Sequence, residues 1–148
     1  ALRRAIRIDP AYNALWQLLA AVTAASEPGV ARAALLRSIE LVPSYAGSHH
    51  ALGLLLAAEG HAVRAREELR TAVRLDPYNP DYRIDLAEQL GPDQRFAALR
   101  NLARAAQLLL MTQEVVTARF GPASREAEAV NEGFERVNRV RRQVMGGR

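Results

Sequence analysis

A segment of 34 residues, from Ser44 to Pro77, constrains the fold of this chain more than any other feature. Apolar and small residues recur within it three, four and seven positions apart, Gly60 interrupts the pattern, and the pattern then resumes. Such spacing indicates two amphipathic α-helices, because these positions share one helix face. Gly60 is expected to end the first helix and Pro77 the second. The patterned residues are His49, Leu52, Gly53 and Leu56, then Ala65, Leu69 and Ala72.

The smallest residues of the pattern predict how the two helices meet. Gly53 lies in the first helix and Ala65 in the second. A helix surface without a large side chain lets a neighbouring backbone approach closely. We therefore expect the two helices to cross near Gly53.

This pattern resembles the tetratricopeptide repeat, whose signature is a large residue, Leu-Gly, Tyr, Ala-x₃-Phe and a closing Pro. In this chain His49 stands at the large position, and Leu56 and Leu69 stand at the two aromatic ones. The resemblance covers residues 1–106. It implies an all-α, right-handed helical solenoid of about three repeats, in which the first helix of each repeat lines a concave groove.

Two further repeats flank this one. Residues 11–43 carry Trp16 at the large position, where its ring is expected to fill the gap between helices. The repeat that starts after Pro77 carries Arg83 there, which departs from the pattern and predicts a weaker contact between its helices. Residues 1–10 match only the tail of a repeat. We interpret the sequence as an excerpt from a longer protein; the alternative is that a partner covers a lone first helix.

Beyond residue 106 no closing proline follows and the helical pattern continues, so we assign residues 107–148 to a C-terminal extension that caps the solenoid. An apolar stripe from Leu99 to Phe120 is typical of a helix that packs along a partner, with a possible break at Thr112. A last helix is expected over residues 123–145. The short Gly121-Pro122 link predicts a hairpin, with its second stripe on Ala127, Val130, Phe134, Val137, Arg141 and Val144.

Composition excludes several kinds of chemistry. The chain has no cysteine and all 20 of its basic residues are arginine. The absence of cysteine excludes disulfides and thiolate nucleophiles. The absence of lysine excludes the phosphate-binding loop that uses a lysine, and it excludes catalysis through a Schiff-base lysine. Adjacent His49 and His50 point about 100° apart on a helix and do not make a metal site. We expect no cofactor, no metal and no enzymatic activity.

Charge and hydropathy limit the classes of partner that the chain is expected to bind. The net charge of +4 is modest, and we do not expect nucleic-acid binding. No apolar run approaches the roughly 18 residues that a membrane span requires, and no signal peptide opens the sequence. The glutamates early and arginines late in the last helix suit the helix dipole, although a patch for RNA or an anionic membrane remains an alternative. We expect a soluble chain, cytoplasmic or periplasmic.

The candidate functional residues follow from the groove that the resemblance implies. The functional interpretation is a groove with an apolar end and an acidic end, and the alternative is a solvated face with nothing bound. Lysines or arginines that would grip a terminal carboxylate, as in the chaperone-binding branch of the family, are absent from these positions. The groove residues are Gln17, Ala21, His50, Leu54, Asp81, Ile84, Asp85 and Glu88, with Ala14, Leu18 and Ala51 beside them.

The sequence as a whole predicts a non-catalytic scaffold or adaptor. Its partner would be a protein or peptide segment held in the groove or on the capping helices. The alternative is that the chain is the repeat region of a larger membrane enzyme, such as a glycopolymer polymerase or ligase, whose chemistry lies outside these residues.

Overall fold

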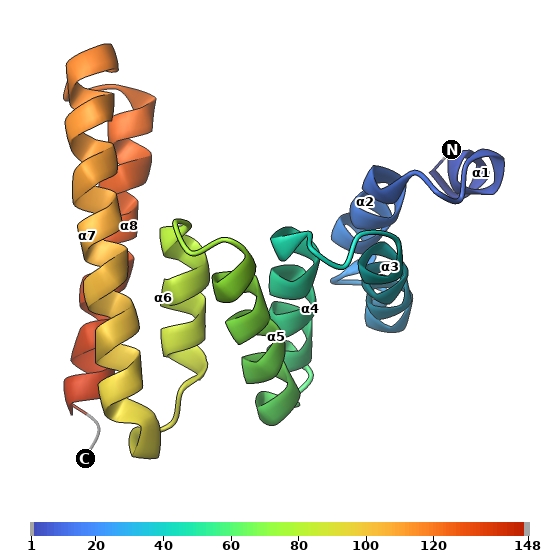
Figure 1. The fold of residues 1–148 in the computed structure, drawn as a ribbon, viewed down its shortest axis with the longest axis horizontal. Helices are drawn as coiled ribbons and strands as arrows, with labels where there is room; N and C mark the ends of the chain where they lie inside the picture. The colour runs from blue at the N-terminus through green and yellow to red at the C-terminus, as the bar shows by residue number, and fades with distance from the viewer. Residues whose placement is uncertain (1, 147–148) are drawn as a thin grey trace. The chain divides into compact units, whose positions relative to one another are not determined.

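The protein is helical throughout the part that its computed structural model describes, residues 2–146 (Figure 1). These residues form eight α-helices, one short 3-10 helix and no strand, which confirms the predicted all-α class. The helices are α1 (Leu2–Ile8), α2 (Asn13–Thr23), α3 (Pro28–Leu41), α4 (Ala46–Ala58), α5 (Ala62–Leu75), α6 (Pro80–Gln89), the 3-10 helix η1 (Pro92–Gln94), α7 (Arg95–Phe120) and α8 (Arg125–Gly146).

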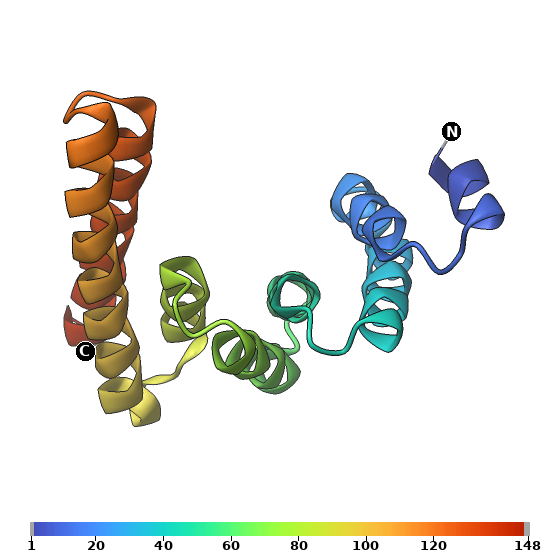
Figure 2. The same cartoon turned by 45° about the horizontal axis from the view of Figure 1, so that its top comes forward.

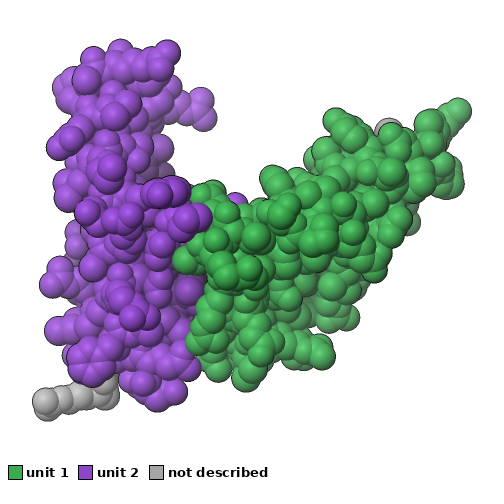
Figure 3. Space-filling view, in the orientation of Figure 1, with its two compact units in different colours: residues 1–76 green, residues 77–148 purple. Residues whose placement is uncertain are grey.

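The helices belong to two compact units, residues 1–76 and residues 77–148 (Figure 3). In the first unit α2 packs on α3 and α4 packs on α5, so that each predicted repeat is a helix–turn–helix pair. The first unit also holds α1 against α2 and α3 against α4. In the second unit α6 packs on α7, and α8 packs on both (Figure 2).

The core of the first unit depends on small residues where helices cross. A Cβ atom built on Gly53 of α4 would lie 2.7 Å from Leu69 Cγ and 3.2 Å from the backbone oxygen of Ala65 on α5. The predicted close crossing is therefore present. Gly60 has a φ of 83°, a left-handed conformation that favours glycine and ends α4 at the predicted place.

One hydrogen bond recurs in all three repeats. A side-chain N–H group at the large position of the signature donates to the carbonyl oxygen of the proline six residues earlier. Proline cannot continue the preceding helix, and the side chain supplies a donor for its carbonyl group. The bonds run from Trp16 Nε1 to Pro10 O (2.8 Å), from His49 Nε2 to Pro43 O (3.0 Å) and from Arg83 Nη2 to Pro77 O (3.0 Å).

Arg83, which was expected to weaken the contact between its two helices, nevertheless bonds to both the preceding turn and the second helix. Its Nε and Nη2 atoms both donate to Pro77 O, and its Nη1 atom donates to Asn101 Oδ1 of α7 at 3.4 Å. His49 uses its second nitrogen in the same way, since its Nδ1 lies 2.7 Å from Glu68 Oε2 of α5. All three residues at this position thus supply an N–H donor, whereas only Trp16 and His49 are aromatic.

The C-terminal hairpin is present, with differences in detail. Helix α7 is continuous from Arg95 to Phe120, so the possible break at Thr112 does not occur; the hydroxyl of Thr112 donates to Leu108 O within the helix. Gly121, with a φ of 88°, ends α7. The helix also runs through residue 106 without interruption, where we placed the boundary of the repeats. Phe120 does not pack as predicted, because its side chain is 52% exposed.

Helix α8 buries a stripe that differs from the predicted one at three positions. Gly133 and Val140 are buried, whereas Phe134 and Val144 are half-buried and Arg141 is exposed. A Cβ atom on Gly133 would lie 2.8 Å from Leu109 Cδ2, so Leu109 packs onto the backbone of α8 at this glycine. Helices α6, α7 and α8 share one hydrophobic core. Its buried residues are Ile84, Ala87, Ala98, Leu102, Ala105, Leu109, Val130, Val137 and Val140.

The close crossing at Gly53 generates the first prediction. Gly53→Ala should lower the free energy of unfolding by about 1–3 kcal/mol, because the new methyl group overlaps Leu69. The matched control is Gly29→Ala in α3, where nothing lies within 4 Å. That change should be neutral or stabilise by up to about 1 kcal/mol, since alanine favours the helix. Urea unfolding of the two variants compares them, and equal shifts would contradict the crossing.

The recurring hydrogen bond generates the second prediction. Arg83→Met keeps the length of the side chain but removes the donors to Pro77 O, and should destabilise the protein by about 1–3 kcal/mol. Arg100→Met, at an exposed position of the same helical unit, should change stability by less than about 0.5 kcal/mol. Thermal unfolding of both variants tests this. A wild-type melting curve for Arg83→Met would show that the bond contributes nothing.

Candidate partner-binding surfaces

A hollow of about 580 Å³ lies in the first unit, between α2 and α4. Its walls are almost entirely apolar. Alanine supplies many of the wall positions, and short side chains leave the space open. The lining residues are Gln17, Ala20, Ala21, Ala24, Ala25, Leu35, Tyr45, Gly47, Ser48, Ala51, Leu54, Leu55 and Ala58.

Tyr45 reaches this hollow because of a glycine two residues later. The ring of Tyr45 precedes α4 and lies over its first turn, where a Cβ atom on Gly47 would lie only 2.7 Å from the ring. A larger residue at position 47 would push the ring away. The side chain of Tyr45 is 44% exposed, so an aromatic face and a hydroxyl group border the hollow.

The two helices beside the hollow carry no acidic or basic residue apart from the histidines of α4. None of the residues of α2 (Asn13–Thr23) is Asp, Glu, Lys or Arg, and the same holds for α4 (Ala46–Ala58). One of the polar lining groups is already bonded, since the Ser48 hydroxyl lies 2.6 Å from that of Ser38. The hollow is therefore an uncharged, apolar surface.

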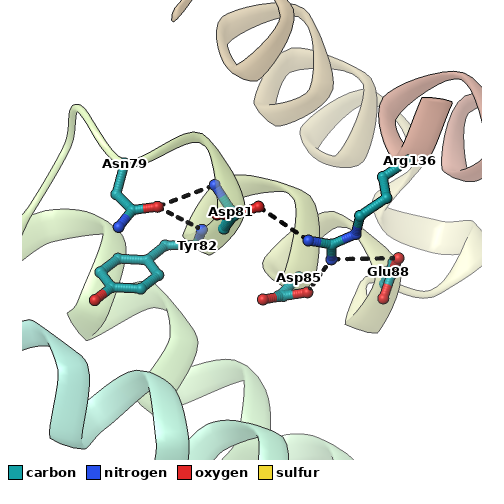
Figure 4. A network of polar contacts seen from close by, with 6 residues as sticks. All are labelled: Asn79, Asp81, Tyr82, Asp85, Glu88 and Arg136. Atoms are coloured by element: carbon teal, nitrogen blue, oxygen red, sulfur yellow. Dashed lines mark hydrogen bonds and ion pairs between the residues drawn. The ribbon is translucent and has the colours of Figure 1, made fainter. Parts of the chain in front are cut away.

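The acidic residues predicted for the groove lie on α6 in the second unit. Asn79 caps this helix by accepting hydrogen bonds from the backbone N–H groups of Asp81 and Tyr82 (Figure 4). The helix then carries Asp81, Asp85 and Glu88 at positions that face α8.

Arg136 of α8 reaches all three carboxylates. Its Nη1 atom donates to Asp81 Oδ1 at 3.0 Å, and its Nη2 atom donates to Asp85 Oδ1 at 2.5 Å and lies 3.9 Å from Glu88 Oε1 (Figure 4). Asp85 is only 7% exposed. Arg136 thus supplies the positive charge that a buried carboxylate requires.

The pKa values in this cluster shift with burial and neighbouring charge. Burial acts to lower the pKa of Arg136, but Asp85, Asp81 and Glu88 outweigh it and raise that pKa above its ordinary value. The pKa of Glu88 is raised by burial and then by the charge of Asp85, against the opposing effect of Arg136. Arg136 therefore stays charged and is committed to the cluster.

The structure separates the predicted groove residues into three groups. Gln17, Ala21 and Leu54 line the hollow of the first unit, together with Ala51. His50 is half-buried on α4 and is not among the lining residues. In the second unit Asp81 and Glu88 remain exposed, whereas Ile84 and Asp85 are buried. Ile84 is fully buried in the core beneath α8, and Asp81, Asp85 and Glu88 face Arg136.

Sequence reasoning did not identify Tyr45 or Arg136 as residues of these surfaces. Tyr45 precedes its helix and falls outside the helical pattern, although the glycine at position 47 was a visible signal. Arg136 lies 51 residues from Asp85, and no spacing rule connects residues so far apart. The arginines of the last helix were interpreted through the helix dipole alone.

Within residues 2–146, no group of three or more His, Cys, Asp and Glu side chains is arranged to hold a metal ion. Across the same residues, no helix combines the length and the apolar character that crossing a lipid bilayer requires.

Comparison with solved structures identifies the fold. Two crystal structures of MamA align over 99% of this chain, with TM-scores of 0.65 and 0.64 and sequence identities of 15% and 14%. The same alignments cover 88% and 82% of the two MamA chains. The TPR2B domain of yeast Sti1, in a complex with pHsp70, aligns over 86% of this chain and 96% of its own, with a TM-score of 0.61 and 16% identity.

These similar proteins consist of tetratricopeptide repeats. This chain has the tetratricopeptide-repeat fold. No family model matches the sequence, and no curated protein matches it. The tetratricopeptide assignment therefore comes from the three-dimensional arrangement of helices and from the residues that the repeats share. In tetratricopeptide terms, α2, α4 and α6 are the first helices of the three repeats, and α8 lies against the last of them.

The contact between Asp85 and Arg136 generates the third prediction. The free energy of unfolding would be measured for Asp85→Asn, for Arg136→Gln and for the double variant. The loss in the double variant should differ from the sum of the two single losses by about 1–3 kcal/mol, because the two side chains share one network. Arg142→Gln is the control, since Arg142 is exposed on the same helix. A strictly additive double variant would show that the pair does not hold α8 to α6.

Proposed function

We propose that this chain is a non-catalytic interaction scaffold that holds a segment of a partner protein in the hollow between α2 and α4. The observation that carries the proposal is the hollow itself. It is large, open and apolar, and three of the predicted groove residues line it: Gln17, Ala21 and Leu54. Exposed apolar surface of this kind on a soluble protein is typical of an interaction site.

The second unit offers less support for partner binding. The carboxylates of α6 already face Arg136, and Ile84 is inaccessible beneath α8. A further hollow of about 570 Å³ lies near Glu88, Arg95 and Val144. It mixes charged and apolar groups, and Arg95 within it donates to the Met145 carbonyl oxygen at 3.3 Å. We therefore place the partner site in the first unit rather than on the capping helices.

The proposal applies equally if the chain is the repeat region of a larger membrane enzyme, the alternative that the sequence leaves open. In that case the hollow would bind a regulatory or assembly partner while the chemistry takes place elsewhere.

The fourth prediction tests the scaffold role in cells. The photo-cross-linking residue p-benzoylphenylalanine would be introduced at Leu54 in the full-length protein, and at Leu36 of α3 as the control. Both leucines are exposed, at 39% and 49%, but only Leu54 lines the hollow. We expect a specific cross-linked protein at Leu54 and not at Leu36. Mass spectrometry identifies it, and the purified partner must then bind the wild-type chain.

No cross-link at Leu54, or the same products at both positions, would contradict a partner site in this hollow.

A further inference from the structure

We infer that the hollow between α2 and α4 accepts an amphipathic α-helix of the partner, which presents bulky uncharged side chains and no acid or base to the surface. The inference rests on the proposed function and specifies the chemistry of the partner. Three properties of the hollow lead to it: few hydrogen-bonding groups, no charge, and walls of small residues.

The shortage of hydrogen-bonding groups selects the backbone conformation of the partner. Among the described lining residues, only Gln17, Tyr45 and Ser48 have polar side chains, and the Ser48 hydroxyl is bonded to Ser38. An extended segment would turn N–H and C=O groups toward this surface and leave most of them without partners, which is costly. A helix satisfies its own backbone groups internally. The hollow is thus suited to a helix laid into a groove.

The absence of charge selects the side chains that enter. Neither α2 nor α4 carries Asp, Glu, Lys or Arg. A charged side chain placed here would lose its hydration and gain no opposite charge in return. Gln17 and Tyr45 leave an amide and a hydroxyl group at the hollow, and these suit a neutral polar residue at the edge of the partner helix.

The small residues of the wall determine how closely the partner approaches. Ala21, Ala24, Ala51 and Ala58 leave room for the side chains of an incoming helix between those of the wall. An open hollow of this size is filled with water when no partner is bound. Leu18 and Val22 are further exposed apolar residues of the same helix, α2. Release of this water from apolar walls drives association.

The test uses designed peptides as probes. The first is a stapled Ala/Gln-based helix of about 16 residues, or between four and five turns, with leucine at positions i, i+3, i+4 and i+7. The second has a central proline and no staple, so that it cannot remain helical. The third is the first with one leucine replaced by lysine. Fluorescence anisotropy with the whole chain measures the affinity of each.

We expect the helical probe to bind and the other two to bind at least about tenfold more weakly. Ala21→Arg should reduce binding of the helical probe by at least about tenfold, since it fills the hollow with a cation. Its matched control is Ala118→Arg. Ala21 and Ala118 are both exposed alanines two residues before the end of a helix, and only Ala21 lines the hollow.

Several results would overturn the inference. These are failure of the helical probe to bind, equal binding of the proline or lysine probe, and equal loss of binding in Ala21→Arg and Ala118→Arg. They are distinguishable from failure of the proposed function. If Leu54 cross-links a partner while the helical probe does not bind, the hollow is an interaction site but its ligand is not an uncharged helix. If Leu54 cross-links nothing, the scaffold proposal itself fails.

Discussion

The first helix of each repeat is held by the same kind of hydrogen bond. A side-chain N–H group of that helix donates to the carbonyl oxygen of the proline six residues earlier in the sequence. Tryptophan, histidine and arginine share little beyond that donor, yet Trp16, His49 and Arg83 make the same bond. The bond ties the first helix of a repeat to the turn that precedes it. Together with the packing of each helix on its neighbour, that attachment positions α2, α4 and α6 and the surfaces that they present.

Helix α8 gives the third repeat a different role from the first two. In the first unit the surfaces of α2 and α4 remain open and apolar. In the second unit Val130, Val137 and Val140 of α8 cover Ile84, and Arg136 neutralises the carboxylates of α6. Part of the surface that the sequence pattern marks as a groove, at Ile84 and Asp85, is thereby buried, while Asp81 and Glu88 stay exposed. The acidic residues of α6 now stabilise the attachment of α8.

The features that the sequence predicted are local or periodic, and those that it missed are neither. The helices, the close approach at Gly53 and the hairpin link at Gly121 follow from spacing and from the conformational freedom of glycine. The pairing of Arg136 with Asp85 joins two helices that no period relates. Arg83 shows a further limit. The signature describes the size of the residue at its position and does not state the N–H donor that Trp16, His49 and Arg83 share.

The lack of Asp, Glu, Lys and Arg on α2 and α4 has a kinetic consequence. Complementary charges accelerate the encounter of two proteins and make its rate sensitive to salt. A surface without charge forgoes that acceleration, so an apolar ligand would arrive by unassisted diffusion and its binding would change little with ionic strength. The strength of such a complex would be governed by how slowly it dissociates. Occupancy would then follow the local concentration of the ligand, which favours one that is tethered nearby or expressed abundantly.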